Sequence, residues 1–265
     1  INRQASYGVQ LLKKTLNKSH RWVTESLLLT KLNFKVALLL GSVYIFAYLL
    51  VPSIPGLSFI SPFLIIAWPI STMIFINFFR LSQSKKETGF KALLKINKEN
   101  MRVLIYLGVI CLFYSLLISL ILSPDINIIL AAASEAEMSE DISSNLVSIF
   151  IKFMVLAIPI LMATWFSPIL IAYHNFGLMK AIKSSFAGVL LSIIPITLSW
   201  LILLGGFISL IFLMIMVFTI LGSSVNVLMS YVLIFLCMLV LAAYISTLFS
   251  FQYTTYKDIY KSIIK

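Results

Sequence analysis

Few side chains in this sequence could act as an acid, a base or a nucleophile. Among its 265 residues there are nine Asp and Glu, two His and two Cys. Acid–base chemistry needs a titratable group that substrate or water can reach. The sequence has none of the catalytic carboxylate pairs, HExxH, GxSxG or phosphate-binding glycine patterns that serve enzymes. We therefore expect a non-enzymatic protein with no catalytic residue, no cofactor site and no metal ligand.

Lys152 is a basic residue inside an apolar stretch and is the first candidate for contact with a lipid or another ligand. A lysine at the centre of a membrane helix costs about 2.5–3.5 kcal/mol on insertion scales, and less near an end, where its ammonium can reach the surface. Three interpretations stay open. The ammonium could reach an outer-leaflet phosphate, pair with the acidic stretch 123–145, or contact an anionic ligand inside the protein.

The other candidate contacts follow from position. His174 lies where the fourth apolar stretch ends, and a histidine that bonds a helix end explains this place better than a catalytic one. A proline inside a spanning helix frees a backbone carbonyl, and such carbonyls often flank cavities. Basic and aromatic residues at the membrane surface can hold headgroups. The remaining candidate lipid or ligand contacts are Pro69, Pro159, Pro195, Trp165, Lys180 and Lys183.

These candidates depend on long apolar stretches for their positions. Hydrophobic residues make up 61% of the chain and charged residues 11%, and several apolar runs reach the ~20 residues that cross a hydrocarbon core. The expected fold class is all-α: a polytopic membrane protein with a single membrane domain over 1–265 and six transmembrane helices in three hairpins, each preceded by an amphipathic interfacial helix. The predicted spans are about 34–51, 62–79, 103–122, 146–165, 187–210 and 227–249.

Residues 1–33 are predicted to form a cytoplasmic amphipathic segment. Residues 5–21 have the apolar spacing of a helix with one apolar face, and a less regular segment follows over 22–32. Such a helix lies in the membrane interface with its basic side towards anionic headgroups. Similar helices are predicted over 89–98 and from Gly177 onward.

Two stretches leave alternatives for the fold. Residues 123–145 form an acidic loop, and its first part, from Asp125, could be a short surface helix. Residues 184–256 have no formal charge, which leaves room for two or three spans. Two spans keep the basic tail with the other basic segments, so we predict a fifth span kinked by Pro195 and open to a break at Gly205–Gly206.

The basic residues gather on one side of this topology. Seven lie in the first 35 residues, seven in 80–102, two in 166–186 and three in the tail, whereas 123–145 has five acidic residues and no basic one. Basic loops stay in the cytoplasm. We therefore predict a bacterial inner-membrane protein with both termini in the cytoplasm and 123–145 in the periplasm. The net charge of +11 then belongs beside headgroups, and no nucleic-acid partner is expected.

From about Trp22 onward the chain resembles the proteobacterial six-span inner-membrane proteins grouped with the YciC-like proteins. The likeness rests on the motifs WFSP at 165–168, MKA and SSF within 179–186, and YKDI at 256–259. Members usually have a proline where the first surface helix meets span one, and this chain has Lys31-Leu32-Asn33-Phe34 there. The resemblance implies the six-span fold and the location; it brings no activity with it.

These patterns favour a protein that handles or senses lipid, or that is a scaffold or accessory subunit of a membrane complex. A transporter or pore for a small solute is the alternative, but it requires a polar stripe that the spans do not supply. The expected partners are membrane lipids, especially anionic headgroups, with a second membrane protein or another copy of the chain left open. We expect a lipid-facing crevice between kinked spans, with Lys152 near its periplasmic end.

Overall fold

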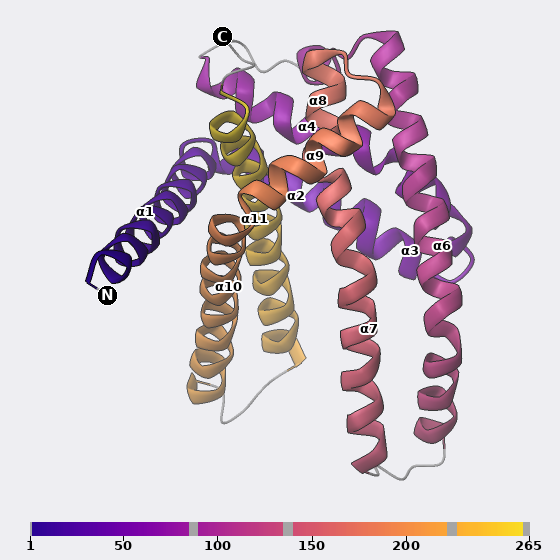
Figure 1. Cartoon of the computed structure of the whole chain (residues 1–265). Helices are drawn as coiled ribbons and strands as arrows, with labels where there is room; N and C mark the ends of the chain where they lie inside the picture. The colour runs from indigo at the N-terminus through magenta and orange to yellow at the C-terminus, as the bar shows by residue number, and fades with distance from the viewer. Residues whose placement is uncertain (1, 85–89, 135–139, 222–226, 262–265) are drawn as a thin grey trace. The chain divides into compact units, whose positions relative to one another are not determined.

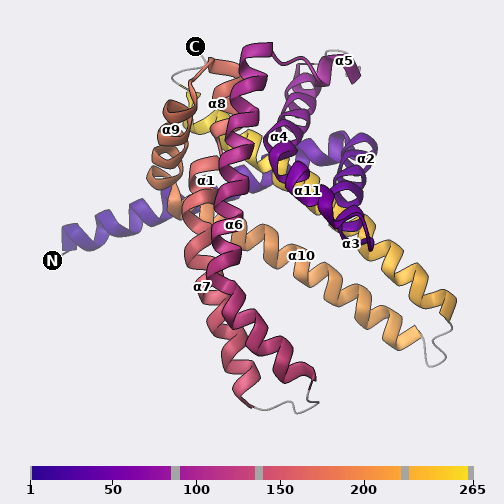
Figure 2. The same cartoon turned by 90° about the vertical axis from the view of Figure 1, so that its right-hand side faces the viewer.

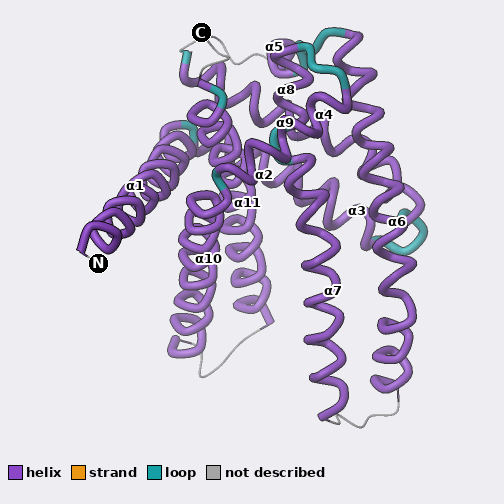
Figure 3. Tube along the Cα trace, in the orientation of Figure 1, coloured by secondary structure: helices purple, strands orange, loops and turns teal. Residues whose placement is uncertain are grey.

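The computed structural model describes residues 2–84, 90–134, 140–221 and 227–261, and every regular element in this part of the chain is helical (Figures 1 and 3). The α-helices are α1 (Asn2–Leu32), α2 (Phe34–Ile45), α3 (Val51–Ser53), α4 (Ser61–Gln83), α5 (Phe90–Leu93), α6 (Lys98–Ser134), α7 (Glu140–Thr164), α8 (Ser167–His174), α9 (Leu178–Leu191), α10 (Ile193–Leu221) and α11 (Val227–Ile259). A π-helical segment, Phe46–Leu50, joins α2 to α3, and a 3₁₀ turn, Ser58–Ile60, precedes α4.

Six helical segments are long and apolar enough to cross a membrane. They are Phe34–Ser53, Ser58–Gln83, Lys98–Ile129, Asn145–His174, Ile193–Thr219 and Ser230–Ile259. Each overlaps one of the six spans expected from hydropathy, so the chain is a polytopic, helical membrane protein by length and composition. The grouping into three hairpins led by interfacial helices stays a prediction.

Three predicted boundaries were wrong: two helices continue where the pattern suggested an end, and one is shorter than expected. The first helix does not change at Trp22, and α1 runs unbroken to Leu32. The third span and the acidic segment from Asp125 are one 37-residue helix, α6, which contains Pro124. The predicted surface helix over 89–98 is shorter, since only the four residues of α5 are helical before the start of α6. Propensity and pattern fix where helices exist better than where they end.

The fifth span begins later than expected, and Pro195 does not kink it. Residues 187–191 belong to α9, the chain turns at Ser192, and α10 begins at Ile193. Pro195 is thus the third residue of a helix, where its missing N–H has no intrahelical partner to lose. α10 also continues through Gly205–Gly206 without a break.

The described residues fall into two compact units. Unit 1 contains the segments Ile1–Ser61, Thr72–Lys95 and Leu191–Lys265, and unit 2 contains Pro62–Ser71 and Ile96–Leu190. The boundary divides α4 after Ser71. The single membrane domain over 1–265 stays a prediction.

In unit 1, α2 packs closely against α11 (Figure 2). A Cβ added at Gly41 would lie 2.1 Å from the carbonyl oxygen of Ala242, so only glycine permits this approach. The Ser246 hydroxyl, one turn further along α11, donates to the carbonyl of Ala37. Small residues let membrane helices approach this closely, and hydroxyl bonds between backbones add to the packing.

In unit 2, the junction between α7 and α8 is bonded by α9. The Ser185 hydroxyl accepts a hydrogen bond from the Phe166 amide (2.9 Å) and donates to the Met162 carbonyl (2.9 Å). Asn175 ends α8 in the left-handed conformation (φ 54°), and the Asn100 amide donates to its side-chain oxygen (2.7 Å). The WFSP and SSF motifs therefore meet in space, which gives them a packing role.

Candidate functional site

A large apolar groove opens on unit 1, between α1, α2, α10 and α11. Its volume is about 820 Å³, within the size range of small-molecule sites. We call it the apolar groove. It is lined by Val23, Leu27, Phe34, Leu38, Ile202, Leu203, Gly206, Phe207, Leu210, Met214, Leu236, Leu239, Val240, Ala243, Tyr244 and Thr247.

Gly206 leaves one position in the lining of the groove without a side chain. A Cβ added at Gly206 would meet nothing within 4 Å, which makes this glycine a gap in the wall of α10. Next to it, the ring of Phe207 stacks on that of Tyr244 of α11, with centroids 4.3 Å apart, and this contact keeps the two helices together. The lining therefore combines a packed aromatic contact with an unfilled position.

The lining offers almost nothing to a polar solute. Tyr244 and Thr247 are the only lining residues with polar side chains, and the Thr247 hydroxyl donates to the Ala243 carbonyl of its own helix (2.8 Å). An ion or sugar moved into such a place would lose its hydration without replacement, at a cost of several kcal/mol per polar group. A hydrocarbon chain has no such cost.

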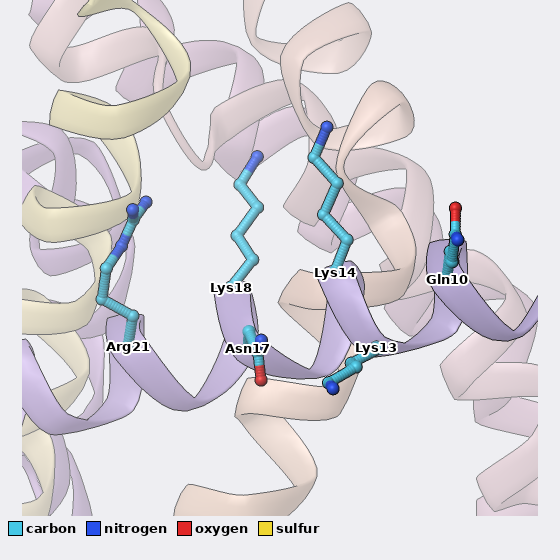
Figure 4. A pocket seen from close by; sticks show the side chains of 6 residues that line it. All are labelled: Gln10, Lys13, Lys14, Asn17, Lys18 and Arg21. Atoms are coloured by element: carbon cyan, nitrogen blue, oxygen red, sulfur yellow. The ribbon is translucent and has the colours of Figure 1, made fainter.

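A second hollow lies along α1 and is basic. It has a volume of about 650 Å³ and is lined by two amides and four cations: Gln10, Lys13, Lys14, Asn17, Lys18 and Arg21. We call it the basic face. Figure 4 shows Lys14, Lys18 and Arg21 extending to the same side of the helix, with Lys13 and Asn17 directed elsewhere. The spacing of three and four residues places these three on one side of an α-helix.

One carboxylate from α11 enters the basic face. Asp258 Oδ1 lies 2.6 Å from Arg21 Nη2, and its Oδ2 lies 3.6 Å from Lys18 Nζ. The indole N–H of Trp22 donates to Oδ2 (3.2 Å), and the Trp22 ring lies under the Lys18 ammonium, 4.7 Å from its centroid. Asp258 of α11 is thus ion-paired with two cations of α1.

Lys152, the first candidate of the sequence, lies in unit 2 and is paired. Its Nζ contacts both oxygens of Asp125, at 3.0 and 2.8 Å, between α7 and α6. Of the three interpretations, the structure shows the pairing with the acidic stretch. Lys152 does not line the apolar groove, and the expected crevice with Lys152 near its periplasmic end stays a prediction.

The other candidate contacts are spread over several elements. Pro69 lies inside α4 and Pro159 inside α7, Trp165 lies between α7 and α8, and Pro195 is in the first turn of α10. None of the eight lines the apolar groove or the basic face.

At the surface end of unit 2, His174 is the last residue of α8, with its ring centroid 5.8 Å from that of Phe176. The Lys180 ammonium lies over the Phe176 ring, 4.1 Å from the centroid. Lys183 is exposed. Cation–ring contacts of this kind stabilise an exposed site by about 0.5–1 kcal/mol. Whether these residues contact lipid stays a prediction.

The groove residues were missed because they look like any other apolar residues of a span. The one available signal was Gly205–Gly206, which the sequence suggested as a helix break. Among the described residues, no group of three or more His, Cys, Asp or Glu could hold a metal ion.

Comparisons with models of protein families, with curated proteins and with solved structures found no match to this chain. The resemblance to the YciC-like proteins therefore stays a prediction. The apolar groove and the basic face are the two features of the chain that bear on what it binds.

Proposed function

We propose that this chain is a lipid-binding integral membrane protein, and that the apolar groove holds an acyl chain. The observation that carries the proposal is the groove itself, about 820 Å³ in volume and almost wholly apolar. Most of its lining comes from Phe34–Ser53, Ile193–Thr219 and Ser230–Ile259, three segments able to cross a membrane. In a membrane the groove faces hydrocarbon, and the molecule at hand to fill it is a lipid.

Occupancy depends on shape, because leaving bulk lipid for an apolar groove brings no hydrophobic gain. Association in the bilayer is driven by close van der Waals contact. A recess beside Gly206 supplies more contact area per chain than a convex helix surface does. The proposal is thus a site for lipid handling or sensing rather than for catalysis.

Filling the recess tests this proposal. Gly206→Leu places a side chain in open space within the groove, and we expect the purified protein to lose at least one tightly retained phospholipid in native mass spectrometry. Gly205→Leu is the matched control, since a Cβ there also meets nothing within 4 Å and Gly205 does not line the groove. Equal lipid retention in both variants would leave the groove without a function, and the scaffold interpretation would replace lipid binding.

We also propose the bacterial inner membrane as the location, with both termini in the cytoplasm. The support is the sequence distribution of basic residues and the family resemblance. Alkaline phosphatase fused at Ser134 should be active, because 123–145 is predicted to be periplasmic, whereas a fusion after the C-terminus should be inactive. The reverse result would overturn the topology.

A further inference from the structure

The basic face has more positive charge than the protein itself neutralises. α1 contains six Lys and Arg residues and one acidic residue, Glu25. Glu25 reaches only Arg21, at 3.8 Å, and Asp258 reaches Arg21 and Lys18. In the described part of the chain no ion pair involves Lys13 or Lys14, which both line the hollow and are exposed. Cations and amides are therefore left for an outside anion.

Contacts with two spanning helices put this face at the level of a membrane surface. The Ser19 hydroxyl donates to the carbonyl of Pro195 (3.0 Å), and the Ser199 hydroxyl donates to the Ser19 carbonyl (3.3 Å). Both partners are in the first turns of α10, whose apolar segment starts at Ile193. Asp258 is one residue from the end of the segment Ser230–Ile259. The basic face thus lies where two spans end, which is where headgroups are.

Asp258 shows which group the face accepts. Its two oxygens take a guanidinium, an indole N–H and an ammonium, and a phosphate presents the same kind of oxygens to the same donors. Charge-assisted bonds of Arg and Lys to carboxylate and to phosphate have similar geometry. Lys14 lies one turn before Lys18 on the same side of α1, so a phosphate bound at Lys14 would compete with Asp258 for Lys18 and, one turn further, for Arg21.

We propose that the basic face binds the phosphate of an anionic lipid headgroup, and that Asp258 competes with that headgroup for Arg21 and Lys18. This rests on the proposed function only in that the chain binds lipid. The headgroup site is separate from the apolar groove, because Lys14 and Lys18 lie on the side of α1 away from Val23 and Leu27 by the 100° turn per residue. Two different lipid molecules fill the two sites.

The test compares lipids that differ only in charge. The full chain in a neutral detergent is titrated with short-chain phosphatidylglycerol and, separately, with phosphatidylcholine of the same acyl chains, and bound lipid is counted by native mass spectrometry. We expect a preference for phosphatidylglycerol that Lys13→Gln/Lys14→Gln reduces more than tenfold, at about fivefold per lysine (the equivalent of ~1 kcal/mol each). Lys95→Gln/Lys98→Gln, which removes two exposed lysines outside the face, should keep the preference.

Removing the competitor gives the sharper result. Asp258→Asn keeps an acceptor for the Trp22 N–H but loses the charge, so it should bind phosphatidylglycerol severalfold more tightly than the native chain. Glu25→Gln makes the same change of charge on the neighbouring carboxylate and should have a smaller effect. Equal gains in the two variants, or a loss in Asp258→Asn with unchanged size-exclusion and circular-dichroism profiles, would overturn the competition.

Two further measurements distinguish a lipid headgroup from free phosphate, and the headgroup site from the apolar groove. Inorganic phosphate at millimolar concentration should not displace phosphatidylglycerol; full displacement would make the face a site for free phosphate and overturn the lipid assignment. Gly206→Leu should lower the binding of both lipids while the preference for phosphatidylglycerol remains. Loss of preference in Lys13→Gln/Lys14→Gln, with Gly206→Leu unchanged, would support the headgroup site and refute the groove.

Discussion

The two units use charge in opposite ways. In unit 2, Lys152 and Asp125 form a one-to-one pair between α7 and α6, and the pair itself is neutral. In unit 1, the single carboxylate of Asp258 is shared by two cations, and further lysines lie beside it. A balanced pair joins two helices, whereas an excess of one sign needs a partner from outside. The residue conspicuous in the sequence, Lys152, is thus paired within the protein, whereas Lys13 and Lys14 of α1 have no ion pair with a described residue.

The units are alike in one respect, a glycine that lets two helices touch. A Cβ at Gly41 would lie 2.1 Å from the Ala242 carbonyl oxygen in unit 1, and a Cβ at Gly108 would lie 2.1 Å from the Ile66 carbonyl oxygen in unit 2. Gly206 is the contrast, because nothing lies within 4 Å of its added Cβ. Unit 1 therefore contains both a glycine in close contact with a neighbouring helix and a glycine at an open position.

The largest expected effect comes from filling a close approach. Gly41→Val and Gly108→Val should each destabilise the protein by about 3 kcal/mol or more, since a backbone carbonyl cannot move aside as a side chain can. The measurement is the unfolding midpoint in detergent. Gly205→Val, at an open position, is the control and should change stability by less than about 0.5 kcal/mol. A similar loss of stability at all three positions would show that the lower helix propensity of valine causes it, rather than contact with a backbone carbonyl.

A smaller effect is expected from the pair in unit 2. Lys152→Met leaves the Asp125 carboxylate without its cation, and because the pair is partly exposed we expect a loss of about 1 kcal/mol. Replacing both residues, as Lys152→Met/Asp125→Leu, should restore most of this stability, with a coupling of about 1 kcal/mol in a double-mutant cycle. Zero coupling would mean that Lys152 is available to lipid after all, and the contrast between the units would fail.

The smallest effect on stability is expected on the basic face. Lys14→Gln should leave the unfolding midpoint unchanged, because Lys14 is exposed and has no ion pair with a described residue. The same variant should weaken binding of phosphatidylglycerol. A fall in the unfolding midpoint as large as that of Lys152→Met would show that Lys14 contributes to packing, as Lys152 does. That result would contradict our proposal.

The sequence by itself determined the six apolar helices, because the length and hydropathy of a span are properties of one local stretch. The dipeptide Pro55-Gly56 is a turn signal in the sequence, and Gly56 has a φ of +86° that glycine adopts without strain. The lysines around Asp258 in the C-terminal segment predict an ion pair, and the structure forms it with Lys18 and Arg21 of α1.

The tertiary structure alone decided which apolar residues make a groove and which make a contact. Gly41 and Gly206 are both glycines in apolar helices, yet one lies against the Ala242 carbonyl and the other against open space. Likewise, the sequence left three possible partners for Lys152. In the structure, α6 continues past Pro124, and Asp125 of that helix pairs with Lys152. In a chain whose spans are apolar on nearly all sides, the pattern does not mark the face that a neighbouring helix will cover. That choice depends on how closely two backbones can approach, which is a property of pairs of helices rather than of either sequence.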